Sequence, residues 1–255
     1  MEKKKIAIFI ISYQAVRTLI SAIERIPASL KKKVEEIYVF DDCSDDNTYY
    51  AGIGYKHLSN LSNLSVYKNP KNLGYGGNQK RGYEYAIKKN YDIVVMLHGD
   101  VQYAPEEIPE LIKPLEAGEA DMVFGSRMKG HPLKGGMPLW KFIGNKSLTW
   151  VENKVLCLKL SEYHSGFRAY SVHALQKVPF RRLPNGYYFD TDIIIQFKIK
   201  GLRIKEISIP THYGVESHKI SFNKSVIYGL NIFKSLFQYW LHKHNLRKIH
   251  KFDFR

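Results

Sequence analysis

Two carboxylates follow an apolar run near residue 40 and are well placed to bind a nucleotide. Asp41 and Asp42 come directly after residues 37–40, which we expect to form a buried strand. Carboxylates at the carboxyl end of such a strand can accept hydrogen bonds from a base or a ribose. Residues 45–47 (Asp-Asp-Asn) are expected instead to form a turn and to cap the next helix.

A second polar group follows the apolar residues 93–97. His98, Asp100 and Gln102 alternate over five residues, so an extended turn would place an imidazole, a carboxylate and an amide oxygen on one side. Such a set suits a divalent cation that bridges phosphates. The simpler alternative is that Asp100 only caps the helix that opens at Pro105.

Two arginines beside small residues are candidates for binding phosphate. Arg127 follows Gly-Ser, and Arg168 closes the run that begins at Ser165. A planar guanidinium can hold phosphate oxygens through two hydrogen bonds, although a surface ion pair is the alternative for each. Asp190 and Asp192 open a later helix, so we expect one to cap it and the other to face the site.

Residues 72–82 are rich in glycine, beginning with Gly74. Glycines here would let the backbone approach a nucleotide. The dinucleotide-binding pattern is not met, because Gln79 stands where its third glycine is required. An ordinary turn and helix start is the alternative.

The elements that must position these groups alternate along the first 125 residues. Short apolar runs predict strands that are covered on both faces. These runs are residues 6–11, 37–40, 64–67, 93–97 and 122–124. Helices are predicted between them at 15–26, at 77–89 and from Pro105. The alternation predicts parallel βαβ units, with the ligand at the carboxyl ends of the strands.

A basic loop rich in glycine and proline, residues 129–139, separates the two halves of the chain. We expect it to be mobile and to close over a phosphate. Beyond it the pattern predicts helices at 140–158 and 190–200, and strands at 167–170 and 203–209.

The C-terminal segment carries apolar residues at helical spacing. They are separated by 4, 3, 4 and 3 residues, as Val226, Leu230, Phe233, Phe237 and Trp240. From Lys219 onward the chain has eight Lys or Arg and one acid, which is typical of a tail that lies on anionic lipid. The alternative is that this stripe packs on the domain. We divide the chain into a catalytic domain, 1–220, and a basic amphipathic helix with its tail, 221–255.

Composition limits the class of protein. The 255 residues are 44% hydrophobic, enough for one sizeable core, and 39 basic against 24 acidic residues leave a net charge of +15. Such a charge indicates a polyanionic partner: nucleic acid, an anionic membrane or a phosphorylated small molecule. No run approaches the roughly 20 apolar residues of a membrane span. Cys43 and Cys157 provide no disulfide framework, which favours a reducing, intracellular compartment.

Together these residues resemble the family-2 glycosyltransferases of GT-A fold, and within them enzymes similar to dolichyl-phosphate and polyprenyl-phosphate mannosyltransferases. Six ordered stretches carry the resemblance over nearly the whole chain. They are residues 11–13, 39–44, 72–74, 98–102, 125–127 and 165–170. The resemblance implies an α/β fold, namely a Rossmann-like nucleotide-diphospho-sugar transferase with a mostly parallel sheet, flanking helices and the C-terminal amphipathic helix.

The resemblance also implies roles for single residues. The residues implied in binding the nucleotide sugar are Tyr13, Asp41, Asp42, Gly74, Asp100 and Arg127. Those implied in holding Mg²⁺ or Mn²⁺ are Asp100, Gln102 and His98. The candidates for acceptor phosphate are Ser165, Arg168 and Lys219. His98 stands where the family has its first aspartate, and an imidazole suits Mn²⁺ better than Mg²⁺, so Asp100 and Gln102 would then hold the ion with water.

These roles predict a metal-dependent, inverting hexosyltransferase with Asp100, Arg127 and Asp192 as catalytic residues. We expect a nucleoside diphosphate sugar as donor and a polyprenyl phosphate as acceptor, at the cytoplasmic face of a membrane to which the protein binds peripherally. A lipid phosphate is already anionic and needs no base, whereas a hydroxyl acceptor would require Asp192 or Asp190.

Three alternatives remain. A nucleotidyltransferase is possible on fold grounds, but residues 12–14 (Ser-Tyr-Gln) stand where its glycine-rich first loop would follow the first strand. A soluble family-2 glycosyltransferase would add the sugar to a saccharide hydroxyl. A nucleic-acid-binding module would explain the charge, but none of the usual recognition motifs is present, so no nucleic-acid partner is expected. The sequence leaves the oligomeric state open.

Overall fold

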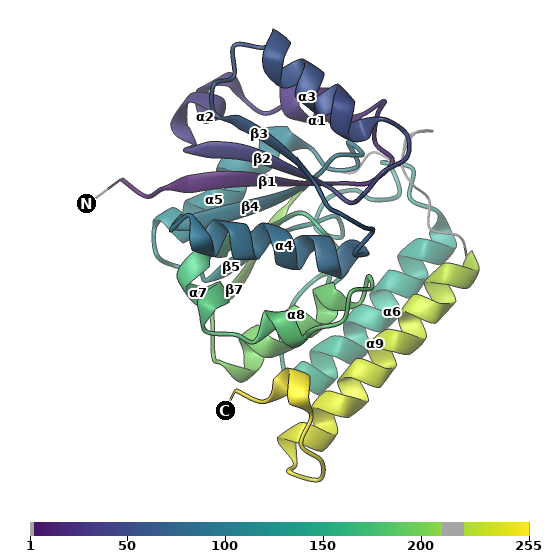
Figure 1. Ribbon diagram of the computed structural model, residues 1–255. Helices are drawn as coiled ribbons and strands as arrows, with labels where there is room; N and C mark the ends of the chain where they lie inside the picture. The colour runs from purple at the N-terminus through teal and green to yellow at the C-terminus, as the bar shows by residue number, and fades with distance from the viewer. Residues whose placement is uncertain (1–2, 211–221, 255) are drawn as a thin grey trace.

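A seven-stranded sheet forms the centre of the computed structural model, which describes residues 3–210 and 222–254 (Figure 1). The strand order is β3-β2-β1-β4-β6-β5-β7, and β6 alone runs antiparallel to its neighbours. The strands are β1 (Ile6–Ser12), β2 (Glu36–Asp41), β3 (Leu64–Lys68), β4 (Ile93–His98), β5 (Met122–Ser126), β6 (Arg168–Ser171) and β7 (Ile204–Ser208). The expected mostly parallel sheet is therefore confirmed.

Helices cover both faces of the sheet, which is why the central strands are apolar on both sides. In β1, Ile8 contributes to one core and Phe9 to the other. The helices on the Ile8 face are α1 (Leu19–Glu24), α2 (Ala28–Lys33), α3 (Thr48–Leu58) and α5 (Ile108–Glu116). Those on the Phe9 face are α4 (Tyr75–Lys88), α7 (Val172–Gln176) and α8 (Phe189–Ile199).

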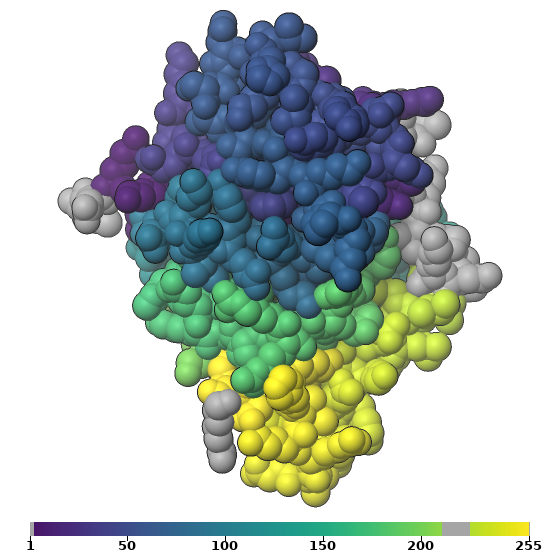
Figure 2. Space-filling model, viewed as in Figure 1, coloured from purple at the N-terminus to yellow at the C-terminus, as the bar shows by residue number. Residues whose placement is uncertain are grey.

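Two long helices, α6 (Leu139–Leu156) and α9 (Phe222–Lys243), lie side by side against the Phe9 layer (Figure 1). Short 3₁₀ turns complete the chain as η1 (Pro105–Glu107), η2 (Phe180–Arg182) and η3 (His250–Phe252). In the space-filling view, α9 and the C-terminal tail form one end of the molecule, opposite the end formed by α2 and α3 (Figure 2).

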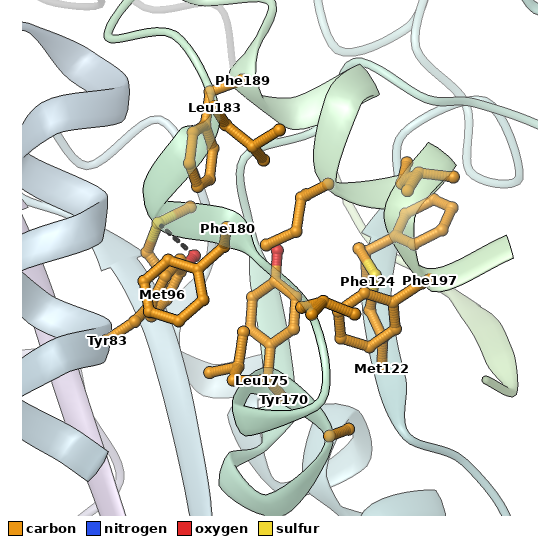
Figure 3. Close-up of a cluster of buried hydrophobic side chains, with 14 of the residues drawn as sticks. Tyr83, Met96, Met122, Phe124, Tyr170, Leu175, Phe180, Leu183, Phe189 and Phe197 are labelled. Atoms are coloured by element: carbon orange, nitrogen blue, oxygen red, sulfur yellow. Dashed lines mark hydrogen bonds between the residues drawn. The ribbon is translucent and has the colours of Figure 1, made fainter. Parts of the chain in front are cut away.

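Aromatic side chains fix α4 and α8 against the sheet (Figure 3). Tyr83 of α4 makes edge contacts with Tyr170 and Phe180, and its hydroxyl reaches the sulfur of Met96 at 3.3 Å. Phe197 of α8 packs edge-on against Tyr170 at 5.7 Å. Because such packing tolerates little displacement, the start of each helix is held at a defined place above the sheet.

The predicted strands and most of the helices are confirmed, and the helix expected at 15–26 is present but shorter than predicted. Only α1 (Leu19–Glu24) is helical there. The backbone N–H groups of residues 14–16 donate instead to the side chains of Ser44, Thr48 and Asp46. These bonds hold the loop after β1 against the loop after β2, in competition with a helical turn.

The C-terminal helix has two apolar sides, and the predicted stripe is the outer one. Its five members, 226, 230, 233, 237 and 240, each keep between 44% and 63% of their surface exposed. A different set, Ile232, Leu236 and Tyr239, packs into the core. The helix therefore packs on the domain without using the stripe. No helix in residues 3–210 or 222–254 is long and apolar enough to cross a bilayer, and the division at residue 220 stays a prediction.

Candidate functional site

The carboxyl ends of β1, β2, β4 and β5 meet at one edge of the sheet. Register pairs Ser12 with Asp41 and Ile11 with His98. Because β6 is antiparallel, the segment before it, residues 165–167, reaches the same edge. The structure thus gathers five of the stretches predicted to do chemistry, and Figure 1 shows this edge facing the α6 side of the molecule.

Asp41 and Asp42 are buried and shape the loops around them. Asp41 accepts hydrogen bonds from the backbone and the hydroxyl of Ser44; burial raises the pKa of Asp41, and those bonds oppose the rise. Asp42 accepts from the side chain of Asn69 and from the backbone N–H groups of Leu73 and Gly74, each at 2.9 Å. A carboxylate can accept about four hydrogen bonds, so Asp42 has about one acceptor position left for a ligand. Nucleotide binding by Asp42 stays a prediction.

Gly74 serves chain packing. Its φ of +76° suits glycine, and a Cβ there would lie 3.0 Å from the carbonyl oxygen of Asn185. The next turn is held in the same way, since the N–H of Gly76 donates to that oxygen at 2.7 Å. The loop before α8 therefore occupies the side of Gly74 on which a Cβ would lie, and nucleotide binding by Gly74 stays a prediction.

His98 is enclosed by aromatic side chains. Tyr103 lies edge-on at 5.0 Å, and the Tyr75 hydroxyl lies 3.4 Å from Nε2. A Cβ on Gly166 would fall 2.4 Å from the same nitrogen, so only glycine fits there. Burial lowers the pKa of His98, and nearby Asp100 opposes this. Nε2 is directed at protein atoms, so the structure does not support His98 as a metal ligand.

Asp100 and Gln102 flank a strained residue at the end of β4. Val101 has a φ of +53°, which is rare for a β-branched side chain and is typical of functional sites. Asp100 is half-buried and accepts the Gln102 N–H at 3.1 Å. No three His, Cys, Asp or Glu side chains in the described ranges cluster as a metal site. A carboxylate and an amide oxygen still suit a hard cation whose other ligands come from phosphate and water.

Tyr13, at the end of β1, keeps 46% of its surface exposed. Its ring is accessible at the same edge of the sheet, as stacking on a base requires, and that role stays a prediction.

Arg127 is held in a buried ion pair, and the predicted alternative of a surface pair is wrong. Its backbone N–H and Nε each donate to Glu162 at 2.8 Å, and Nη2 reaches the carbonyl of His164 at 3.1 Å. Asn145 of α6 also donates to Glu162. Burial would raise the pKa of Glu162, but Arg127 and Asn145 hold it below its usual value. The guanidinium is therefore fixed in orientation.

Lys141 completes this corner, and it is not among the residues predicted from the sequence. It is half-buried near the start of α6, where burial and the charge of Arg127 lower its pKa to about 8, while Glu162 opposes the shift. Two cations that share one carboxylate form a place where an added anion is favoured. A lysine inside an amphipathic helix that follows a basic loop was the only available signal.

Arg168 and Ser165 do not face an acceptor. Arg168 is fully buried and donates to the backbone carbonyls of Tyr163, Ser165 and Asp190 at 2.7–2.9 Å. Ser165 is also fully buried. Their role is to hold the segment before β6 against the start of α8, which corrects the acceptor assignment. Lys219 lies outside the described residues.

The two candidate bases are both engaged. Asp190 accepts from the Tyr75 hydroxyl at 2.8 Å and from Gln79 at 3.1 Å. Asp192 is buried in the core, where Lys251 of the C-terminal tail donates to both its oxygens at 2.8 and 2.9 Å. Burial raises the pKa of Asp192, and Lys251 opposes this. Asp192 thus anchors the tail, and its assignment as a catalytic base is wrong.

With this geometry in place, comparison with known proteins decides the family. Residues 7–178 match Glycosyl transferase family 2. The chain belongs to this family.

Relatives and solved structures agree with that result. A UDP-N-acetylglucosamine–dolichyl-phosphate N-acetylglucosaminyltransferase of Methanococcus voltae is 27% identical over 79% of this chain and 84% of its own. A dolichol-phosphate mannosyltransferase of Pyrococcus furiosus is 27% identical over 96% of this chain and 64% of its own. Glucosyl-3-phosphoglycerate synthase of Mycobacterium tuberculosis, solved with Mn²⁺, UDP and its product, has a TM-score of 0.67 at 20% identity, covering 92% of this chain and 80% of that one. The fold is GT-A.

Proposed function

We propose that this family-2 enzyme transfers a sugar from a nucleoside diphosphate sugar to a polyprenyl phosphate at a membrane surface, with inversion at C1. One observation carries the proposal. Lys141, beside Arg127 and Glu162, lies between the exposed apolar residues Trp140 and Ile143 of α6. An acceptor with an anionic head and an apolar chain matches that arrangement.

α9 carries a second exposed apolar surface, the outer stripe, whose five residues are each 44% to 63% exposed. Phe237 and Trp240 stack on each other within it at 6.2 Å. Exposed apolar patches of this kind mark interaction sites, and an amphipathic helix with basic neighbours is typical of peripheral membrane binding. We propose that α6 and α9 rest on the lipid that carries the acceptor. The cytoplasmic side stays a prediction.

The relatives support the acceptor class. The Methanococcus voltae and Pyrococcus furiosus proteins are named for transfer to dolichyl phosphate. The glucosyl-3-phosphoglycerate synthase acts on a small phosphorylated acceptor by its name, and it supports only the fold here. A phosphate on the acceptor is common to these names.

The chain's own residues account for the reaction as follows. A phosphate oxygen of the acceptor attacks C1 of the sugar, the bond from C1 to the diphosphate breaks, and the nucleoside diphosphate leaves with the electron pair. In this proposal Arg127 and Lys141 hold the acceptor phosphate, which differs from the donor role that the resemblance implies for Arg127, and Glu162 orients Arg127. The phosphate monoester has a second pKa of about 6, so no base is needed near neutral pH.

Asp100 and Gln102 would hold a divalent cation at the end of β4. When bound, Mg²⁺ or Mn²⁺ would stabilise the negative charge on the leaving diphosphate. Asp42 positions the loop on one side of this place through Leu73 and Gly74, and the strained turn at Val101 aims Asp100. The donor phosphates therefore meet a preformed oxygen-rich edge.

A saccharide hydroxyl as acceptor would need a carboxylate to take its proton. Asp192 is bound to Lys251, and Asp190 is 4% exposed and already accepts two hydrogen bonds. Their engagement favours an acceptor that requires no base.

The test is a transfer assay with radiolabelled nucleotide sugars, Mg²⁺ or Mn²⁺, and a short polyprenyl phosphate. We expect label to enter the organic phase only when the lipid phosphate is present, and the donor that supports this identifies the sugar. The unphosphorylated polyprenol is the control and should accept no label. Transfer to a free saccharide with none to the lipid phosphate would contradict the proposal.

A further inference from the structure

A chain of three side chains links α6, the segment before β6, and α9. Nδ1 of His164 lies 3.0 Å from the hydroxyl of Tyr228, and its Nε2 lies 3.2 Å from a carboxylate oxygen of Glu152. The side chain of Glu152 is fully buried, and that of His164 is 7% exposed. None of the three carries out a step of the reaction described above.

The chemistry of the imidazole orders this chain. Nε2 of His164 faces an oxygen of Glu152 at a distance that allows an ion pair when the ring is protonated, and neither atom has a hydrogen-bond partner among the described residues. Nδ1 of His164 and the Tyr228 hydroxyl share a hydrogen bond, in which the hydroxyl donates when Nδ1 carries no proton. Thr191 of α8 donates to the other oxygen of Glu152 at 3.1 Å. Each link therefore depends on its neighbours for orientation.

The inner end of the chain touches the reaction site. The backbone carbonyl of His164 accepts from Nη2 of Arg127 at 3.1 Å, so the position of His164 sets the position of that arginine. Thr191 is adjacent to Asp190, which holds Tyr75 beside His98. Burial is the main cause that raises the pKa of Tyr228, and the negative charges of Asp190 and Glu152 raise it further. The hydroxyl therefore lies close to these groups.

The outer end belongs to the lipid-facing helix. Tyr228 stands next to Ile227, which is 59% exposed, and two residues before Leu230 of the outer stripe, which is 63% exposed. The same turn of α9 approaches α6, because a Cβ on Gly229 would lie 3.9 Å from Leu148. A shift of α9 on binding a surface would therefore move the Tyr228 hydroxyl relative to His164.

We propose that Tyr228, His164 and Glu152 are positioning residues that couple the seating of α9 on lipid to the placement of Arg127. The inference rests on the proposed transfer to a polyprenyl phosphate. The hydroxyl of Tyr228 is the only link in this chain that α9 supplies. Its removal leaves the stripe, the ion pair of Arg127 and the donor site in place.

The test compares Tyr228→Phe with the wild type on vesicles of phosphatidylcholine and phosphatidylglycerol that contain the polyprenyl phosphate. Tyr239→Phe is the matched control, because Tyr239 is a buried tyrosine of the same helix. We expect Tyr228→Phe to lower kcat roughly tenfold, with vesicle binding and the KM for the donor unchanged. Tyr239→Phe should keep the wild-type kcat.

A double variant separates coupling from simple loss of stability. Tyr228→Phe combined with His164→Leu should lose no more kcat than the more impaired single variant, because both changes break the same chain. Additive losses, or a wild-type kcat in Tyr228→Phe, would overturn the coupling. An inactive wild type with every donor would instead overturn the proposed function, and this inference with it.

Discussion

The carboxyl edge of the sheet and the α6–α9 surface differ in how their side chains are partnered. At the sheet edge, protein groups already bind the charged side chains: Asp42 accepts three hydrogen bonds, Arg127 is paired with Glu162, and Arg168 binds three carbonyls. On α9, Phe237 and its neighbours in the outer stripe are exposed. One region is built for fixed geometry, and the other is built to meet something outside the chain.

Under the proposed function, this difference would let one small chain handle a charged donor and an acceptor with an apolar chain. Preorganised groups stabilise developing charge without rearranging during the reaction. An apolar surface contributes binding free energy only when it is removed from water, at about 25 cal/mol per Å² of buried area. The two regions meet at Lys141. This residue lies in α6, and its charge interacts with Arg127 and Glu162.

The largest effect is expected from Glu162→Gln, which removes the charge that balances Arg127. Loss of one partner from a buried pair costs about 3–5 kcal/mol in the free energy of unfolding. Urea unfolding measures this, with Glu110→Gln as control, because the exposed pair of Glu110 with Lys113 should contribute about 0–1 kcal/mol. Equal losses in the two variants would refute the contrast between buried and exposed pairs.

The pH dependence of stability follows from the same residue. The folded state lowers the pKa of Glu162, so its contribution to stability is complete above its unfolded pKa and is lost as the pH falls through the folded value. The difference between the wild type and Glu162→Gln should therefore narrow in acid. A gap that widens as the pH falls would contradict the assignment of a charged Glu162.

Asp100→Asn should reduce transfer by about 10²–10³-fold, because a neutral amide binds a divalent cation more weakly than a charged carboxylate does. The half-buried side chain contributes little to the core, so the unfolding midpoint should stay near that of the wild type. The exposed acid Asp45 provides the control variant, Asp45→Asn. Asp100→Asn with full activity would remove Asp100 from the mechanism.

The site residues also show how much of the structure could be predicted from the sequence. The strands and the meeting of residues 41–42, 98–102 and 125–127 could be predicted, because buried parallel strands are continuous apolar runs whose carboxyl ends share one edge. The partners could not. Glu162 lies 35 residues from Arg127, and Lys251 lies 59 residues from Asp192. Patterns of neighbouring residues do not predict contacts between residues so far apart in the chain.

The outer stripe of α9 is a second case in which the sequence predicted the element but not its contacts. Its period predicted a helix correctly, but period does not reveal which of two apolar sides meets the core. Ile232 and Leu236 pack into the core because they face α8 and the sheet layer. The five residues of the stripe are therefore exposed, and the alternative that they pack on the domain is wrong.

A moderate effect is expected from a paired substitution in the stripe, Leu230→Ser with Phe237→Ser. Full burial of one such side chain is worth about 1.5–3 kcal/mol, and Leu230 and Phe237 have 63% and 60% of their surface left to bury, so co-sedimentation with anionic vesicles should weaken by roughly one to two and a half orders of magnitude. The fold should be unaffected, since both residues are exposed. Leu58→Ser on α3, where Leu58 is 90% exposed, is the control. Unchanged sedimentation of the paired variant would exclude the stripe from lipid binding.

The smallest effect concerns pH. Because the pKa of Lys141 is lowered to about 8, its charge is lost as the pH rises through that value, and kcat/KM for the lipid phosphate should fall there. Lys141→Arg stays charged, so its profile should remain flat to higher pH. A decline at the same pH in both proteins would assign the titration to another group.

The central claim is that Lys141 and Arg127 bind the phosphate of a lipid acceptor beside the apolar surface. The most direct measurement is the KM for a short polyprenyl phosphate in Lys141→Met, compared with Lys146→Met, which removes an exposed lysine from the same helix. We predict that Lys141→Met raises this KM at least tenfold with the donor KM unchanged, and that Lys146→Met matches the wild type. Equal KM values for the lipid phosphate in the two variants would contradict the account.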